Sequence, residues 1–562
     1  MTARDQRVLL VTGSLIAGSH ASVWAELRKQ RAQYVASSRS LLDLKVKLTP
    51  IELFLTHALA QRALPRDAAW CPDVERFFAK RLEAETPTLT EVVLAGLLEA
   101  EGLATTSVTL SELFANADTR ERLLAEHACV LVSTTLIRDL SELEPLVRLV
   151  ARPGVRVVLG GALVGLLHGR WQPLAGVDVL AVGYGEVLVP ALAAWIRSGY
   201  RAFPPSEAYA VESRAGCLVV RAHRPEGRSL DALPSADWAG WARRGGRRLR
   251  MVRYESVRGC PYRCEFCNFP FLFDDTSFRI KSAKRIADEW ERYVKELGVE
   301  VVSCFDSLFT VPRSRIRELC DEIERRRLRV RWICYARGDD LVTDDLLPRM
   351  RDAGLAQVHI GAESGSQAIL DAMNKRQTVE KNAQALLACR ELGVSTIVTL
   401  VLGFPGETRA TIEETYRFLE RTRPDFYLLA LLNTRMEGVP LLSPESRARF
   451  ALEDWNDGRT NQPFFRHATM DAREAMDLLE ALDDRARRER LSLWAPLFFD
   501  GTPEYELSER EPLLAYQQHL VESHPRLHRL FALAHRWVDA RFAAQIAARY
   551  PSAPPRAASL AA

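Results

Sequence analysis

Residues 258–267 read Arg258-Gly-Cys260-Pro-Tyr-Arg-Cys264-Glu-Phe-Cys267, which places three cysteines in one short segment. Soft thiolates at this spacing can bind three of the irons in an iron–sulfur cube. The segment offers no fourth cysteine, and an open coordination position distinguishes a catalytic metal centre from a structural one. A three-cysteine zinc site is the alternative interpretation, but zinc would favour a nearby histidine, and His223 lies far upstream.

Buried-strand and helical patterns alternate through the sequence that follows. Strands are expected at 254–257, 300–305, 330–335, 357–361, 395–402 and 425–432. Helices are expected between them, for example at 283–297, 313–326 and 411–421. Six such units without a Rossmann glycine fingerprint predict a partial (β/α)6 barrel, whose site lies at the carboxyl ends of the strands.

This part of the chain resembles the radical S-adenosylmethionine (SAM) enzymes, whose cysteine triad follows the first strand of a six-unit partial barrel. The resemblance implies that Cys260, Cys264 and Cys267 are the metal ligands of a [4Fe–4S] cluster. Its open iron would bind the amino and carboxylate groups of SAM. Phe266 would shield the cluster, and Arg337, at the end of the third strand, would pair with the SAM carboxylate or form a surface salt bridge.

Further SAM contacts are expected where later strands end. In relatives, stretches like 361–365, with Glu363 and Ser364, and 403–408, which begins with Gly403, follow the fourth and fifth strands. Many relatives also end the second strand with Gly-Gly-Glu, which holds the SAM ammonium. This chain has Cys304-Phe-Asp-Ser307 there, so Asp306 or another carboxylate is expected to substitute.

A second α/β pattern precedes the barrel. Continuous apolar strands are expected at 7–12, 128–134, 155–159 and 177–182, with helices at 90–101, 140–150 and 186–196. This alternation predicts a Rossmann-like doubly wound parallel sheet, which binds ligands at its carboxyl strand ends. Small or polar residues occupy those ends. They are Ser133, Thr134, Thr135, Gly160, Gly161, Gly183, Gly185 and Glu186.

A Rossmann-like sheet directly before such a barrel resembles the cobalamin-dependent radical SAM enzymes, methyltransferase type. The resemblance implies that the small residues at the strand ends bind cobalamin; a purely structural sheet is the alternative. The Asp-x-His-x-x-Gly motif of a histidine cobalt ligand is absent around His20. The long insertion after the first strand could cover the lower face of cobalt, with Arg62 or Arg66 as the occluding cation.

The expected organisation is an α/β chain with a mostly helical end. It comprises a cobalamin-binding domain at 1–200 with an insertion at about 15–88, a linker at 201–250, the barrel at 251–438, a helical substrate-closing region at 439–550 and a disordered tail at 551–562. The net charge is +3, from 76 Lys and Arg against 73 Asp and Glu, which argues against nucleic acid or an anionic membrane as partner. No apolar run approaches the roughly 20 residues of a membrane span.

The resemblance implies a cytoplasmic, monomeric enzyme that moves a methyl group from SAM via methylcobalamin to an unactivated carbon, or phosphorus, of a small natural-product precursor. Tryptophan C2 methyltransferases and phosphinate P-methyltransferases are the most similar group. An external electron donor of the flavodoxin or ferredoxin type would be needed. The alternatives are a non-methylating cobalamin-binding radical SAM enzyme, which cyclises or rearranges its substrate, and a non-catalytic iron–sulfur/cobalamin sensor. A tRNA-modifying role lacks a basic RNA-binding appendage.

Overall fold

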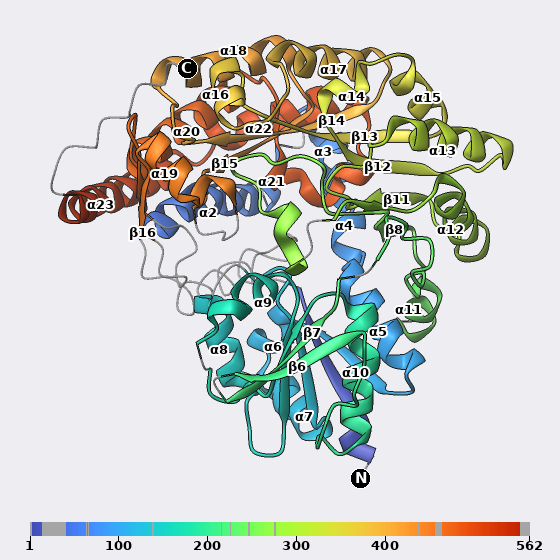
Figure 1. The fold of residues 1–562 in the computed structure, drawn as a ribbon. Helices are drawn as coiled ribbons and strands as arrows, with labels where there is room; N and C mark the ends of the chain where they lie inside the picture. Colours follow the sequence, from blue (N-terminus) through green and yellow to red (C-terminus); the bar gives the residue numbers. More distant parts are fainter. Residues whose placement is uncertain are drawn as a thin grey trace.

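The computed structural model contains two α/β units and a C-terminal set of helices (Figure 1). It describes residues 3–550 except 14–40, 63, 66, 138–139, 173, 215, 225, 246–247, 275–276, 435–438 and 456–463. His20, Arg66 and the expected disordered tail therefore lie outside the described residues. Among the described helices, none is long and apolar enough to cross a bilayer.

The N-terminal unit is a seven-stranded sheet in the order β2-β1-β3-β4-β5-β7-β6. Its parallel strands are β1 (Arg7–Thr12), β2 (Ala104–Thr109), β3 (Cys129–Ser133), β4 (Arg156–Gly160), β5 (Val179–Val182) and β7 (Cys217–Ala222). β1 and β3 are almost wholly buried, as expected for strands covered on both faces. Helices α5 (Leu89–Ala100), α6 (Leu110–Ala115), α7 (Ala117–Glu126), α8 (Leu140–Val150), α9 (Ala162–Leu167) and α10 (Gly185–Arg197) complete the unit, which confirms the doubly wound fold.

The expected linker at 201–250 is partly wrong, because it contains two strands of this sheet. β6 (Tyr209–Arg214) pairs antiparallel with β7, and β7 continues the sheet beside β5. Cys217, Val219 and Val220 of the alternating stretch 217–222 are buried. This stretch is therefore part of the hydrophobic core and not a connecting segment. Helix α11 (Trp238–Gly245) then leads to the second unit, with Trp238 fully buried.

The second unit is a parallel sheet in the order β18-β15-β14-β13-β12-β11-β8. Its strands are β8 (Met251–Tyr254), β11 (Val301–Cys304), β12 (Arg331–Ala336), β13 (Leu355–Glu363), β14 (Ser395–Leu402), β15 (Phe426–Leu431) and the short β18 (Leu493–Trp494). Between them lie α12 (Ala283–Leu297), α13 (Arg313–Arg325), α14 (Gly338–Leu341), α15 (Leu346–Asp352), α16 (Gln367–Ala372), α17 (Val379–Glu391) and α18 (Arg409–Thr422). Figure 1 shows these helices along the outer side of the sheet, away from the N-terminal unit.

The first barrel strand ends earlier than the pattern indicated. β8 stops at Tyr254, and β9 (Val257–Arg258) pairs instead with β10 (Arg279–Ile280) in a separate two-stranded sheet. The buried Asp306 accepts hydrogen bonds from the backbone N–H groups of Ser256 and Val257, at 2.6 and 2.7 Å. Because these donors are taken by a carboxylate, the strand cannot continue its ladder, and the chain turns toward the cysteine segment.

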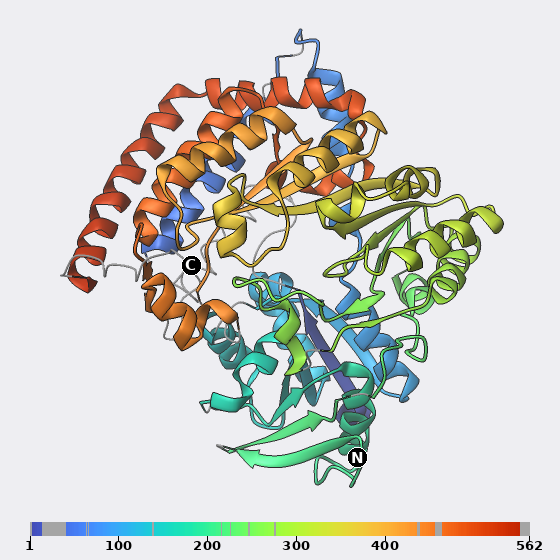
Figure 2. The ribbon, with the colours of Figure 1, turned by 45° about the horizontal axis from the view of Figure 1, so that its top comes forward.

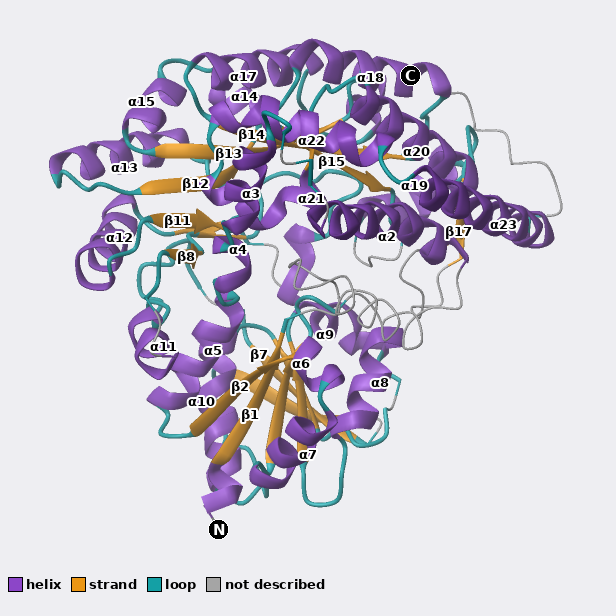
Figure 3. Cartoon of the chain, turned by 180° about the vertical axis from the view of Figure 1, so that it is seen from behind, coloured by secondary structure: helices purple, strands orange, loops and turns teal. Residues whose placement is uncertain are grey.

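The described part of the insertion packs on the barrel. Its helices are α2 (Leu41–Arg62), α3 (Cys71–Ala79) and α4 (Leu82–Glu85). They lie beside α21 (Ala495–Phe498), η5 (Phe499–Glu504), α22 (Arg510–Glu522) and α23 (Pro525–Arg549), as Figure 3 shows from behind. Phe77 is buried with its ring 5.8 Å from that of Phe498, which is 6.4 Å from Phe426 at the start of β15. Helices α2, α3 and α4 thus close the amino ends of the barrel strands, and Arg62 is exposed on α2. The expected cover over cobalt stays a prediction, because residues 14–40 of the insertion lie outside the described residues.

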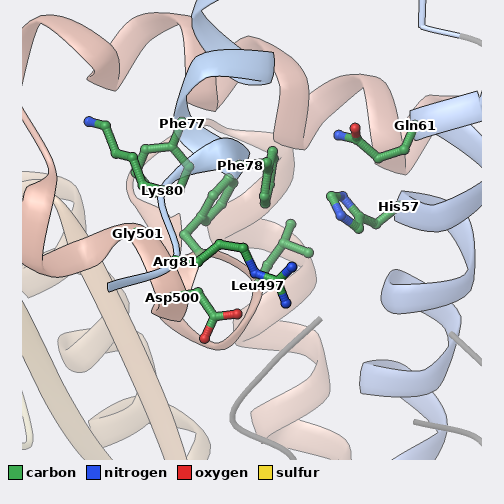
Figure 4. A pocket seen from close by; sticks show the side chains of 10 residues that line it. His57, Gln61, Phe77, Phe78, Lys80, Arg81, Leu497, Asp500 and Gly501 are labelled. Carbon is green, nitrogen blue, oxygen red and sulfur yellow. The ribbon is translucent and has the colours of Figure 1, made fainter. Parts of the chain in front are cut away.

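A cavity of about 180 Å³ remains in this seam (Figure 4). Aromatic rings line one part of it and polar side chains the other. Its lining includes His57, Gln61, Phe77, Phe78, Lys80, Arg81, Leu497 and Asp500. Lys80 is paired with Glu509, and His57 Nδ1 lies 2.7 Å from the Tyr516 hydroxyl. The polar atoms are therefore used largely to join the insertion to α22 and its flanking turn.

Candidate cofactor and active site

The cysteine segment lies at the carboxyl ends of the barrel strands, between β9 and the short helix η3 (Phe269–Asp274). Cys264 is buried, whereas Cys260 and Cys267 are partly exposed. Burial raises the pKa of all three thiols, and that of Cys267 to about 12, while the cation of Lys375 opposes the shift. A bound metal is what would keep thiols in such a place deprotonated.

Among the described residues, no group of three or more His, Cys, Asp or Glu side chains is arranged to hold a single metal ion. Each thiolate of an iron–sulfur cube binds a different iron, so the cluster assignment rests on the cysteine spacing, and the zinc site stays the alternative.

Arg258, two residues before the triad, ties this segment to the N-terminal unit. Its guanidinium pairs with Glu186 at the start of α10 and, at 3.0 Å, with Glu255. The same guanidinium lies 4.4 Å from the centre of the Tyr184 ring, and Arg279 lies 5.0 Å from that centre. The side chains of Arg258 and Glu186 are only 12% and 14% exposed, so this contact is shielded from water. We call Tyr184, Glu186, Arg258 and Arg279 the domain clamp.

Arg337, which directly follows β12, supports the cysteine segment. Arg337 is buried and donates to the carbonyl oxygens of Lys375 and Arg376 at 2.9 and 2.8 Å. Its guanidinium also pairs with Asp339 and lies 3.9 Å from the centre of the Tyr262 ring. The expected pairing of Arg337 with the SAM carboxylate stays a prediction, because in this structure its donors hold the 375–376 turn beneath the triad.

Glu363 ends β13 in a left-handed backbone conformation, with φ of 64°. Its carboxylate forms a buried ion pair with Lys375 Nζ at 2.8 Å. Lys375 Nζ lies 5.8 Å from the centre of the Phe266 ring, so the expected shielding residue belongs to the same cluster of side chains. A strained backbone and a buried ion pair are features that concentrate at ligand sites.

The remaining predicted SAM contacts are engaged within the protein. Ser364 Oγ lies 3.3 Å from Thr415 Oγ1 and accepts from the Ser366 N–H at 3.1 Å. Both Asp306 oxygens accept from Ser256, whose hydroxyl donates at 2.6 Å. In this structure the Asp306 carboxylate shapes the end of β8, and its expected replacement of the Gly-Gly-Glu carboxylate stays a prediction.

Gly403 occupies the turn after β14 with φ of 86°, and a Cβ there would lie 2.9 Å from Ala475. The buried carboxyl group of Glu407 accepts from the Gly403 N–H, and His467 Nε2 donates to the Gly403 carbonyl at 3.1 Å. Burial lowers the pKa of His467 to about 4, so this histidine is neutral. Gly403 thus has a clear packing role, and its contact with SAM stays a prediction.

The residues predicted to bind cobalamin gather at one edge of the N-terminal sheet. Thr134 is buried; its hydroxyl donates to the Gly160 carbonyl at 2.8 Å and accepts from the Val164 N–H at 3.3 Å. Ser133 Oγ donates to Thr135 Oγ1 at 3.3 Å. Gly161 has φ of 102°, and a Cβ there would lie 2.7 Å from Thr135 Oγ1. These residues shape the edge itself, and their cobalamin contacts stay predictions.

The loop after β5 brings this edge to the barrel. Gly183, with φ of 118°, approaches so closely that a Cβ would lie 2.7 Å from Ala222, and one on Gly185 would lie 2.8 Å from Leu94. Glu186 then reaches Arg258 of the domain clamp. Helix α9, which follows β4, packs beside η3, just beyond the triad. Figure 2 shows η3, in green, between the two units. The carboxyl edge of the sheet and the cysteine segment therefore face each other.

Sequence reasoning missed Lys375, Tyr184 and the interdomain role of Arg258. Lys375 lies between α16 and α17, outside any expected motif. Arg258 was visible beside the triad, but its partner lies 72 positions away in the chain. A single lysine, or an arginine next to a metal motif, does not by itself indicate a functional role in the sequence. The role becomes apparent only when the tertiary structure shows which groups surround the side chain.

Comparisons with known proteins agree with this geometry. Residues 254–419 match the model of the Radical SAM superfamily, so this chain carries a radical SAM domain. The chain is 30% identical over 290 residues to the anaerobic magnesium-protoporphyrin IX monomethyl ester cyclase of Rubrivivax gelatinosus, covering 49% of this chain and 50% of the relative. It is 25% identical over 210 residues to the bacteriochlorophyllide d C-12(1)-methyltransferase of Chlorobaculum tepidum, covering 37% and 45%. Each match spans half or less of the relative's own length.

Among solved structures, the chain resembles the radical SAM methyltransferase TsrM from Kitasatospora setae, with cobalamin and a [4Fe–4S] cluster bound. The TM-score is 0.53 at 19% identity, covering 74% of this chain and 89% of that one. A second TsrM structure, which holds tryptophan and a SAM analogue, gives 0.50 and covers 66% and 77%. At this identity the likeness establishes a shared fold, and it spans both α/β units.

If the domain clamp joins the two units, substitution of Arg258 should reduce the protection of nearby backbone amides from hydrogen exchange. Arg258→Met should raise amide hydrogen exchange in both 183–186 and 257–260, because it removes the shared partner of two carboxylates. The free energy of unfolding should fall by about 1.5–3 kcal/mol, the usual contribution of a hydrogen bond to a charged group. Arg258→Lys should restore only part of the protection, since an ammonium cannot pair with both carboxylates and lie flat on Tyr184. Arg197→Met, which breaks the Arg197–Glu101 pair within the N-terminal unit, is the matched control. Unchanged exchange in both segments of Arg258→Met would contradict the clamp.

Glu407 predicts a pH dependence of stability. Burial raises the pKa of its carboxyl from 4.5 to about 8, so between these values the folded protein keeps a proton that the unfolded chain loses. The stability contribution of this group therefore falls as pH rises through that window. The thermal midpoint of Glu407→Gln, relative to wild type, should accordingly increase between about pH 5 and pH 8. Glu413→Gln, on helix α18, which begins two residues after Glu407, is the control; a pH-independent difference for Glu407→Gln would refute the assignment.

Proposed function

We propose that this chain is a cobalamin-dependent radical SAM methyltransferase that acts on an unactivated carbon, or phosphorus, of a small natural-product precursor. The observation that carries the proposal is the domain clamp. It holds a cysteine segment with cluster spacing against the carboxyl edge of a doubly wound sheet, where such sheets bind their ligands. Two cofactor sites that face each other are what a transfer between cofactors requires.

The chain's residues fit these groups. Cys260, Cys264 and Cys267 would hold the cluster, and the strand ends at 133–135, 160–161 and 183–186 would hold cobalamin. When bound, the cluster with SAM supplies radical chemistry and cobalamin supplies a transferable methyl group. The positive charges of Lys375 and Arg337 lie beside the triad and favour its thiolate form.

The protein's own contribution is position and exclusion of water. Asp306 fixes the break after β8 and so directs the triad toward the sheet. The clamp sets the separation of the two units, and the buried Lys375–Glu363 pair keeps charge at the site without opening it to solvent. A closed, oriented site protects reactive intermediates from side reactions.

The substrate is the less constrained part of the proposal. Tryptophan is one candidate, supported by the TsrM structure that contains it. We expect a cytoplasmic monomer supplied with electrons by a flavodoxin- or ferredoxin-type donor. None of the ten cysteines, all of which lie in the described part of the chain, forms a disulfide, which suits a reducing compartment.

Anaerobic purification with hydroxocobalamin, followed by a visible spectrum and metal analysis, tests both cofactor sites. Wild type should show cluster absorbance, corrin bands and iron. The triple variant Cys260→Ala, Cys264→Ala and Cys267→Ala should lose the iron but keep the corrin bands. Cys320→Ala, which alters a buried cysteine on α13, is the control and should retain both. Zinc in place of iron would refute the cluster, and iron without corrin would refute the cobalamin assignment.

Product mass separates methylation from its alternatives. Incubation with SAM, a reductant and L-tryptophan should yield a product heavier by one methylene. Formation of 5′-deoxyadenosine with no such gain in mass would favour the non-methylating alternative. The similarity of this chain to a cyclase is the observation behind that alternative. An absence of SAM consumption with any substrate offered would favour the sensor.

A further inference from the structure

Three large apolar side chains remain exposed on the inner face of the barrel sheet. Phe305 is 40% exposed, Tyr335 36% and Leu428 37%, although they lie on or next to β11, β12 and β15 within a seven-stranded sheet. Protein interiors are normally packed as densely as organic crystals. Exposed large apolar groups on the concave side of a sheet therefore mark space that a ligand can fill.

Strand register shows that these residues share one face with other chemically distinctive groups. Arg253 pairs with Ser303, two residues before Phe305, and Tyr335 pairs with His359. Residues paired in this way on parallel strands point to the same side of the sheet. The opposite face carries Trp332, whose ring lies 5.9 Å from that of Trp290 on α12, so the outer helices cover that other side.

The inner side chains form a continuous row across four strands. The Arg253 guanidinium lies 5.3 Å from the centre of the Phe305 ring, and that ring lies 6.3 Å from Tyr335. Tyr335 lies 4.6 Å from the His359 ring. His359 Nε2 donates to Gln357 Oε1 at 3.2 Å, and Gln357 itself donates to Ser395 Oγ and the Thr502 carbonyl. We call Arg253, Phe305, Tyr335 and His359 the inner row.

The charge of the inner row is confined to one end. Burial lowers the pKa of His359 to about 4, so this histidine offers a neutral ring. The positive charge of the row lies on Arg253, which also lines the pocket beside Arg258, Glu186 and the barrel's first strand. A run of aromatic rings that ends in a guanidinium complements a flat ring with an acidic group at one edge.

We propose that the inner row binds the substrate, as a planar conjugated ring that carries a carboxylate, with the ring against Phe305 and Tyr335 and the carboxylate directed to Arg253. The assignment of this ligand as the substrate rests on the proposed function. The adenine of SAM is also a flat ring, and it could occupy the inner row in place of the substrate. Its purine carries no carboxylate, so the two occupants differ in what Arg253 contributes.

Binding of small probes to the anaerobically reconstituted protein tests this inference without turnover. The probes are 2-naphthylacetate, its neutral counterpart 2-naphthaleneethanol and the saturated cyclohexylacetate, measured by isothermal titration calorimetry. We expect 2-naphthylacetate to bind about tenfold more tightly than either of the others. Arg253→Gln should weaken 2-naphthylacetate about tenfold and leave 2-naphthaleneethanol unchanged. Phe305→Leu and Tyr335→Leu should weaken both ring probes about fivefold.

Phe499→Leu is the matched control, because Phe499 is 37% exposed on η5 at the opposite end of the barrel. It should bind every probe as wild type does. Equal binding of all probes by wild type and the three inner-row variants would overturn the inference, as would displacement of 2-naphthylacetate by S-adenosylhomocysteine, which would assign the row to the adenosyl group. Cluster and corrin spectra are recorded on each sample. Their loss in wild type refutes the proposed function, whereas normal spectra with unchanged probe affinities refute the inner row alone.

Discussion

The arrangement of this molecule depends on one ion pair made across two domains. Arg258 and Glu186 lie 72 positions apart in the sequence, yet their shielded side chains pair, with the ring of Tyr184 stacked beneath the guanidinium. Because Arg258 stands two residues from the first cysteine, any movement of the N-terminal sheet is transmitted to the cysteine segment. The clamp thereby determines how the two α/β units face each other, which neither unit could determine by itself.

Buried charge recurs around the same place, and each instance has a partner that explains it. Asp306 is satisfied by Ser256 and Val257, and Glu363 by Lys375. Removing Lys375 or Glu363 alone would leave an uncompensated buried charge, so this pair specifies a single conformation of the site. The resulting rigidity suits chemistry in which two bound cofactors must keep their orientation. Several residues expected to contact SAM take part in these protein contacts, and their contacts with SAM stay predictions.

The insertion and the C-terminal helices close the opposite end of the barrel. Phe77 and Phe498 belong to segments more than four hundred residues apart, and their rings meet near the start of β15. With the amino ends of the strands covered in this way, the inner face is reached from the side of the cysteine segment. The inner row and the domain clamp meet there, since Arg253 and Arg258 line one pocket between the units.

Much of the fold was predictable from local pattern. β1 and β14 have the expected bounds, as do α8 and α12, because continuous apolar runs and helical periodicity survive in any tertiary setting. The cysteine spacing likewise points to its metal chemistry without a structure. Tertiary contacts decided the rest: Asp306 ended β8 early, β6 and β7 joined the sheet from an expected linker, and α2–α4 packed on the barrel. Each of these outcomes depends on partners far away in the chain, and a sequence pattern carries no record of which distant group will take a hydrogen bond or cover an apolar face.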